Sequence, residues 1–279
     1  MLMRTVVLFG GLVALAQAQP KGGPPVQAIQ QVKPGLYMIA GAGANSEVRV
    51  TNEGLIVVDG KLAGEQNYNA LMEQIKSVSS QPVKYLIVTH HHADHTGNND
   101  RFLAAGVQVI GHENLNLAAA TGNSVPASPN MTYPGADYAL RLGGVEVQLH
   151  HYGRAHTSGD SVVYFPDLRV VAVSDVITTG MLGPLADYAG GGSFLEWPKV
   201  LESILKLDFD ACIPGNGGVL SKADVQAYKT KIETFVSRAK EAVHNGATKD
   251  QLMAQIKTDD LGWTPRVPNV DAFYAELQK

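Results

Sequence analysis

The chain has a single cysteine, Cys212, and no block of basic residues. One thiol cannot form a disulfide within the chain, so stability has to come from a buried core or from a bound metal ion. The 22 Lys and Arg residues against 26 Asp and Glu residues give a formal net charge of -4. Because no basic cluster is present to follow a phosphate backbone, we expect no nucleic acid partner.

After its first eighteen residues the sequence has no apolar run long enough to cross a membrane. Those first residues, MLMRTVVLFGGLVALAQA, combine one basic residue, an apolar run from Val6 to Leu15 and a small-x-small ending. This pattern is typical of a cleavable secretory signal. We therefore expect residues 1–18 to be a signal peptide and the mature protein to be periplasmic or secreted, without membrane contact. The alternative is an uncleaved anchor, which Gly10 and Gly11 within the apolar run disfavour.

The rest of the chain is expected to form one folded domain. Residues 19–34 begin with QPKGGPPVQ, which cannot bury much apolar surface, and are predicted to be a flexible leader. Residues 35–279 alternate between β-rich runs and helical patterns, with amphipathic helices predicted over 68–78 and 225–243.

Two successive β-rich halves, each interleaved with helices, predict an α/β fold. We expect a four-layer αβ/βα sandwich, with two mixed β-sheets packed face to face and helices outside. The segment 120–136 lacks periodicity and is rich in turn formers, so it is interpreted as a lid or a plain connection.

Four of the nine histidines lie within six residues of the stretch IVTHHHADHTGNN, directly after an apolar strand. In extended chain alternate side chains point the same way, so His90 and His92 can face one point while His91 faces away. Asp94 and His95 follow where the chain is expected to turn into a helix. Crowded imidazoles beside a carboxylate need a cation to offset their desolvation. The spacing therefore predicts a metal site.

This H-x-H-x-D-H stretch resembles the signature of the metallo-β-lactamase superfamily. Four further motifs in the family's order extend the resemblance from about residue 35 to residue 218: GLIVVDG, GRAHTSGD, VVAVSD and PGNG. The resemblance implies the family's fold and assigns roles to three further residues. Asp59 would accept a hydrogen bond from a ligand histidine, His156 would be a metal ligand, and Asp175 would bridge two metal ions.

The resemblance implies two metal sites, and the chain departs from the family at the second. The ligands are three imidazoles in the first site and one imidazole with two carboxylates in the second: His90, His92 and His156, then His95, Asp94 and Asp175. Where the family shows P-G-H-G, this chain has Asn216 in place of the histidine. A neutral amide oxygen is a weak zinc donor, so we predict one tightly bound Zn²⁺ and a weaker second site. Iron or manganese are alternatives, because carboxylates favour harder ions.

Three neutral nitrogens that leave one coordination position open are the arrangement of a catalytic zinc site. The pKa of water on such a metal falls to about 7, so hydroxide is available at neutral pH. Asp94 is expected to be the catalytic acid or base when only the first site is filled. These features predict a zinc-dependent metallo-hydrolase. Together with export, the resemblance to the superfamily implies that it opens a small cyclic amide or ester, either a β-lactam or a lactone-like substrate.

Two other functions remain open at this point. A phosphodiesterase would use the same metal ions, but it needs basic or hydroxyl groups for phosphate, and the sequence has only Arg154, Thr157 and Ser158 close to a ligand. A metal-binding protein with weakened catalysis would account for the lost histidine at Asn216. The intact set of three histidines disfavours this alternative, because such a site is still chemically competent.

Overall fold

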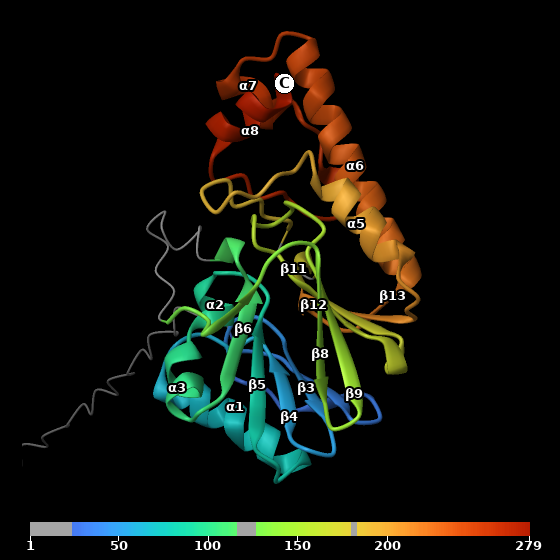
Figure 1. The fold of residues 1–279 in the computed structure, drawn as a ribbon. Coiled ribbons are helices and arrows are strands. Elements are labelled where there is room, and N and C mark those ends of the chain that lie inside the picture. Colours follow the sequence, from blue (N-terminus) through green and yellow to red (C-terminus); the bar gives the residue numbers. More distant parts are fainter. Residues whose placement is uncertain (1–23, 116–126, 180–182) are drawn as a thin grey trace, which may run out of the picture.

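The computed structural model describes residues 24–115, 127–179 and 183–279, and it shows two β-sheets packed together with helices around them (Figure 1). Both sheets are mixed, and the predicted α/β fold is confirmed. The predicted signal peptide, residues 1–18, lies outside the described residues. Within the described residues no helix combines the length and the apolar character needed to span a membrane.

The first sheet is built from the N-terminal half of the chain, and its strands lie side by side in chain order. They are β1 (Gln30–Lys33), β2 (Leu36–Ile39), β3 (Ser46–Val50), β4 (Leu55–Val58), β5 (Val83–Val88), β6 (Gln108–His112) and β7 (Met131–Tyr133). Neighbours are antiparallel from β1 to β4 and parallel from β4 to β7. The connection from β4 to β5 runs through α1 (Glu65–Val78), and that from β5 to β6 runs through α2 (Ala93–Thr96) and α3 (Asn99–Ala104).

The second sheet follows from the C-terminal half, in the order β13-β12-β11-β10-β9-β8. Its strands are β8 (Asp137–Leu142), β9 (Val145–His150), β10 (Val162–Phe165), β11 (Val170–Thr178), β12 (Ala211–Asn216) and β13 (Leu220–Ser221). Only β11 and β12 are parallel. A short 3-10 helix, η1 (Pro166–Leu168), turns the chain between β10 and β11.

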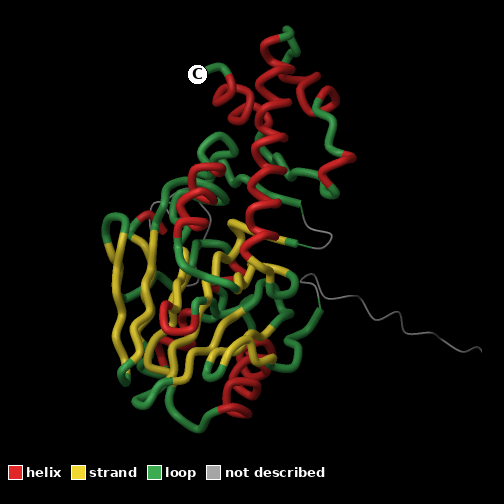
Figure 2. Tube along the Cα trace, turned by 90° about the vertical axis from the view of Figure 1, so that its right-hand side faces the viewer, coloured by secondary structure: helices red, strands yellow, loops and turns green. Residues whose placement is uncertain are grey.

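The remaining helices lie at the outer side and the far end of the second sheet (Figure 1). They are α5 (Trp197–Lys206), α6 (Lys222–His244), α7 (Lys249–Gln255), the 3-10 helix η2 (Asp259–Leu261) and α8 (Val270–Leu277). Figure 2 shows that α6 and the helices after it rise well beyond the strands. The predicted helices over 68–78 and 225–243 are α1 and α6.

The protein has four layers, helices, sheet, sheet and helices, and an apolar cluster fills each of the three spaces between them. The cluster between the sheets joins residues of both, among them Ile56, Ile87, Val163, Ala172 and Ile213. A second cluster packs α1 and α3 on the outer face of the first sheet, and a third packs α5 to α8 on the outer face of the second sheet. Because both faces of the central strands are covered, β4 and β10 are buried at every position and read as continuous apolar runs.

Two segments differ from the sequence expectation. Of the predicted flexible leader, residues 19–23 lie outside the described residues. The described part is ordered against the first sheet, because β1 pairs with β2 and the backbone N–H of Gln27 donates to Ala40 O at 2.9 Å. The apolar side chains of Val26 and Ile29 pack partly buried against the first sheet, which the preceding Pro and Gly residues obscured. In the segment 120–136, residues 131–133 form β7, whereas residues 120–126 lie outside the described residues.

Phe235 on α6 is the central aromatic side chain of the third cluster. It is fully buried, and its ring centroid lies 4.9 Å from that of Phe194 and 5.6 Å from that of Phe273. We expect Phe235→Ala to lower the free energy of unfolding by about 3–5 kcal/mol, because it leaves a cavity. Urea unfolding followed by circular dichroism measures this. The exposed neighbour Lys240 provides the control, since Lys240→Ala should change stability by less than about 0.5 kcal/mol. Equal losses in both variants would contradict the assignment of this core.

Candidate metal centre

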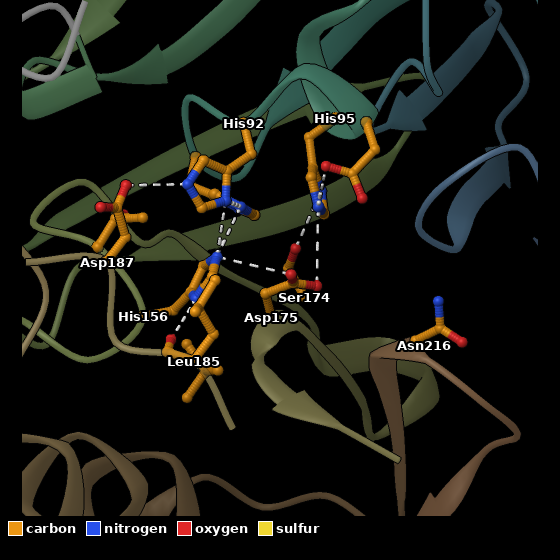
Figure 3. A network of polar contacts seen from close by, with 12 residues as sticks. His92, His95, His156, Ser174, Asp175, Leu185, Asp187 and Asn216 are labelled. Atoms are coloured by element: carbon orange, nitrogen blue, oxygen red, sulfur yellow. Dashed lines mark hydrogen bonds and ion pairs between the residues drawn. The ribbon is translucent and has the colours of Figure 1, made fainter. Parts of the chain in front are cut away.

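Four side chains from three parts of the chain meet where the two sheets come together. His90 and His92 follow β5, His156 lies between β9 and β10, and Asp175 lies on β11. Potential ligand atoms of these four residues lie within 4.8 Å of one another, so the group could hold a metal ion (Figure 3). The structure thus brings together the three histidines that the sequence proposed for the first site.

The three imidazoles point one nitrogen each at a common centre. His156 Nε2 lies 3.1 Å from His90 Nε2 and 2.9 Å from His92 Nδ1, and the last two atoms are 3.1 Å apart. Nitrogens that bind one zinc ion tetrahedrally at 2.0–2.1 Å would lie about 3.3 Å from one another. The spacing is therefore close to that of a zinc site.

The outer nitrogen of each ring has an oxygen partner. His90 Nδ1 lies 3.2 Å from Thr89 Oγ1, and His92 Nε2 lies 3.0 Å from a carboxylate oxygen of Asp187. His156 Nδ1 donates to the carbonyl of Leu185 at 2.6 Å. These partners favour the proton on the outer nitrogen and turn the inner lone pair toward the centre.

Neutral imidazole is the form that binds a metal ion, and the protein favours it here. Burial, assisted by the neighbouring histidines, holds the pKa of His90 and His156 well below the ordinary histidine range. Three lone pairs at about 3 Å repel one another unless a cation lies between them. The donor set therefore fits a metal ion.

A second group of acidic and imidazole side chains adjoins the first. His95 Nδ1 contacts Asp59 Oδ2 at 2.7 Å, while His95 Nε2 is buried without a hydrogen-bond partner. That nitrogen lies 3.7 Å from Asp94 Oδ1 and 3.7 Å from Asp175 Oδ1. Asp175 Oδ2 faces the other way, 3.5 Å from His156 Nε2. Asp175 therefore lies between the two groups, as a bridging carboxylate would.

Asp59 has the geometry expected of an acceptor behind a ligand histidine. It follows β4 in the left-handed backbone region, at φ 58°. Besides His95 it accepts hydrogen bonds from the backbone N–H of Thr89 at 2.9 Å and from the Thr89 hydroxyl at 2.8 Å. Burial lowers the pKa of His95, but the carboxylates of Asp59 and Asp94 outweigh it and raise that pKa to about 10.

Asn216, at the end of β12, is not joined to this cluster. Its side-chain amide donates to the carbonyl of Gly43 at 3.4 Å, and Figure 3 shows it apart from the histidines, with no interaction drawn between them. Its role as a ligand stays a prediction. Gly43 itself lies against Asp94, since a Cβ atom on Gly43 would stand 2.4 Å from that of Asp94.

Asp187 is a site residue that the sequence motifs did not identify. Its Oδ2 atom lies 3.0 Å from His92 Nε2 and 3.3 Å from His91 Nε2. Burial raises the pKa of this carboxyl, but hydrogen bonds from His91 and His92 outweigh it and hold the pKa well below its ordinary range. The only local sign was an acidic residue shortly before three consecutive glycines, at positions 190–192.

Replacing Asn216 by histidine tests whether this position limits the second site. We expect Asn216→His to raise the amount of zinc bound under limiting metal, because imidazole is a stronger zinc donor than a neutral amide. Elemental analysis after dialysis measures the zinc content. Asn216→Ala is the matched control and should not raise it. Equal zinc stoichiometry in the histidine variant and the unaltered protein would remove this interpretation.

Comparison with known proteins places this site in a family. The sequence profile described as the metallo-beta-lactamase superfamily matches residues 42–235. Among named relatives, the alpha subunit of 2,4-dinitroanisole O-demethylase from Nocardioides sp. (strain JS1661) is 29% identical over 148 residues, 53% of this chain and 44% of that protein. Metallo-beta-lactamase IND-1 from Chryseobacterium indologenes is 27% identical over 161 residues, 58% of this chain and 65% of that enzyme. This chain thus covers less than two thirds of either relative.

Solved structures share the fold at low identity. A metallo-beta-lactamase from Pontibacter korlensis superposes with a TM-score of 0.66 at 19% identity, covering 75% of this chain and 99% of that one. The sec-alkylsulfatase Pisa1 from Pseudomonas sp. gives a TM-score of 0.73 at 17% identity, covering 90% of this chain and 50% of that one. Since the family profile matches well over half of the chain, the protein belongs to the metallo-beta-lactamase superfamily.

Proposed function

We propose that this member of a metallo-hydrolase superfamily is a zinc-dependent hydrolase that opens a cyclic amide or ester, of the β-lactam or lactone class. One observation carries the proposal: three imidazole nitrogens converge, two of them from the buried rings of His90 and His156, while each outer nitrogen has an oxygen partner. Relatives named as metallo-beta-lactamases, at 25–27% identity, support the β-lactam end of this substrate range.

His90, His92 and His156 would hold the first metal ion. The second, weaker site would use three side chains and the amide of Asn216: Asp94, His95 and Asp175. Bound zinc supplies a Lewis acid and lowers the pKa of water. The protein's own contribution would be to orient the three imidazoles through their outer nitrogens, to favour the neutral form of His90 and His156 by burial, and to leave Asp94 on the solvent side.

When only the first site is filled, Asp94 is the carboxylate that we assign to proton transfer. Its side chain is 35% exposed, against 15% for Asp175. A substrate that approaches from solvent therefore meets Asp94 before it meets Asp175. Its carboxylate would take a proton from the attacking water and return it to the leaving nitrogen or oxygen.

The structure disfavours a phosphodiesterase. Arg154, the basic group nearest to a ligand in sequence, is bound by Glu196, with Nη2 and Nε at 2.6 and 3.0 Å from Oε1. Thr157 is also engaged, since its backbone N–H and its hydroxyl both donate to Asp160. Two of the three groups that could have recognised phosphate are thus used within the protein.

Metal removal and replacement of Asp94 test the function together. We expect chelation to abolish turnover of a chromogenic β-lactam or an acyl-lactone, and added zinc to restore it. Asp94→Asn should lower kcat by at least about 100-fold, because the amide cannot carry the proton. Steady-state kinetics at matched zinc measures both. Asp100→Asn, at an exposed aspartate on α3, is the control and should stay within about twofold.

Two outcomes would contradict the proposal: turnover that survives chelation, or zinc content near one per chain without hydrolysis of any ester, lactam or phosphodiester. The panel should also include 2,4-dinitroanisole and a secondary alkyl sulfate, since two similar proteins are named for these substrate classes. Failure of the whole panel would favour a metal-binding protein with weakened catalysis.

We further propose that the protein is exported, on the basis of the signal-like pattern of residues 1–18. Expression of the full chain in a bacterial host followed by cell fractionation tests this. We expect the mature protein outside the cytoplasm, with an N-terminus near Gln19. A protein that stays in the cytoplasm with an uncleaved N-terminus would contradict it.

A further inference from the structure

One loop orients two of the three proposed ligands of the first site. This orienting loop, residues 185–193, lies between β11 and α5. The carbonyl of Leu185 accepts the hydrogen bond from His156 Nδ1 at 2.6 Å, and Asp187 Oδ2 lies 3.0 Å from His92 Nε2. Any displacement of this loop therefore shifts the partners of both rings at once.

On one side the orienting loop is fixed to the segment that carries His156. The backbone N–H of Asp187 donates to His156 O at 2.8 Å, and that of Ser193 donates to Ala155 O at 2.9 Å. The approach is close enough to require glycine, since a Cβ atom on Gly192 would stand 2.3 Å from His156 O. This side of the loop is therefore coupled to the position of His156.

On the other side a carboxylate of the last helix holds the loop. Glu276 on α8 accepts a hydrogen bond from the Tyr188 hydroxyl at 2.7 Å and another from the Ser193 hydroxyl at 2.6 Å, one on each oxygen. The side chain of Glu276 is only 13% exposed. Hydrogen bonds to a charged and largely buried acceptor are stronger than those between neutral groups.

We propose that Glu276 is a positioning residue for the metal centre, acting through the orienting loop on His92 and His156. A neutral imidazole can carry its proton on either nitrogen, and an acceptor held behind the ring keeps the proton there and the lone pair inward. Glu276 lies outside residues 42–235, the part that matches the family profile. The inference rests on the proposed function, because it concerns the same metal site.

Zinc affinity of the full-length protein is the decisive measurement. Competition with a chromophoric chelator should show about tenfold weaker binding in Glu276→Gln and in Tyr188→Phe, the lower end of the range for groups behind a ligand. The double variant should be no weaker than the weaker single variant, because both changes break the same contact. Asp187→Asn, which acts directly on His92, should weaken binding at least as much.

Asp271→Ala is the matched control on the same helix. Asp271 is exposed and pairs with Lys249 at 3.0 Å, away from the orienting loop. Its variant should bind zinc within about twofold of the unaltered protein. Circular dichroism of each metal-free variant verifies that the comparison is between folded proteins.

The outcomes separate this inference from the proposed function. If the unaltered protein binds no zinc, the proposed function fails and the inference falls with it. If the unaltered protein binds zinc and Glu276→Gln binds equally well, the inference alone is overturned. Lower stability of Glu276→Gln with unchanged zinc affinity would also overturn it, because it would show a purely structural role.

Discussion

The mutual approach of three imidazole nitrogens is the constraint on which the site depends. His90, His92 and His156 bring these atoms to 2.9–3.1 Å from one another, with His90 and His156 buried and His92 half-buried. Such an arrangement is favourable only when the rings are neutral, when each lone pair points inward and when a cation can lie between them. Burial favours the neutral form of His90 and His156. Three different acceptors orient the three rings: a hydroxyl, a carboxylate and a backbone carbonyl.

The two sheets meet directly beneath these rings. The Thr89 hydroxyl, after β5 in the first sheet, lies 2.8 Å from Asp59 Oδ2 and 2.8 Å from the hydroxyl of Ser174 on β11 in the second sheet. Asp175 follows Ser174 and reaches both groups of ligands. Its place depends on a glycine on the neighbouring strand, since a Cβ atom on Gly215 would stand 2.0 Å from Asp175 Oδ1. Packing of the sheets and geometry of the site are therefore parts of one arrangement.

The helices at the C-terminal end add a second level of support. α5 to α8 cover the outer face of the second sheet, and α8 also contacts the loop that faces His92 and His156. The same region engages Arg154, which pairs with Glu196 next to α5 and lies 3.7 Å from Glu276. A basic group close to a ligand in sequence is thus used for structural support.

Local patterns in the sequence determined the parts of this protein whose geometry is local. The spacing of His90, His92, Asp94 and His95 places four donors at the end of one strand, and apolar periodicity identified α1, α6 and the two β-rich halves. Each of these depends on neighbours within a few residues along the chain.

Only the tertiary structure decided which distant groups complete the site. Asp187 contacts His92, which is 95 residues away in the sequence, and Glu276 contacts Tyr188, which is 88 residues away. The separation of the Asn216 side chain from the histidines and the pairing of β1 with β2 likewise follow from how strands pack. An aspartate shortly before glycines is common in loops and does not by itself indicate a role. Asp187 can orient His92 only because packing brings the two side chains to 3.0 Å from each other.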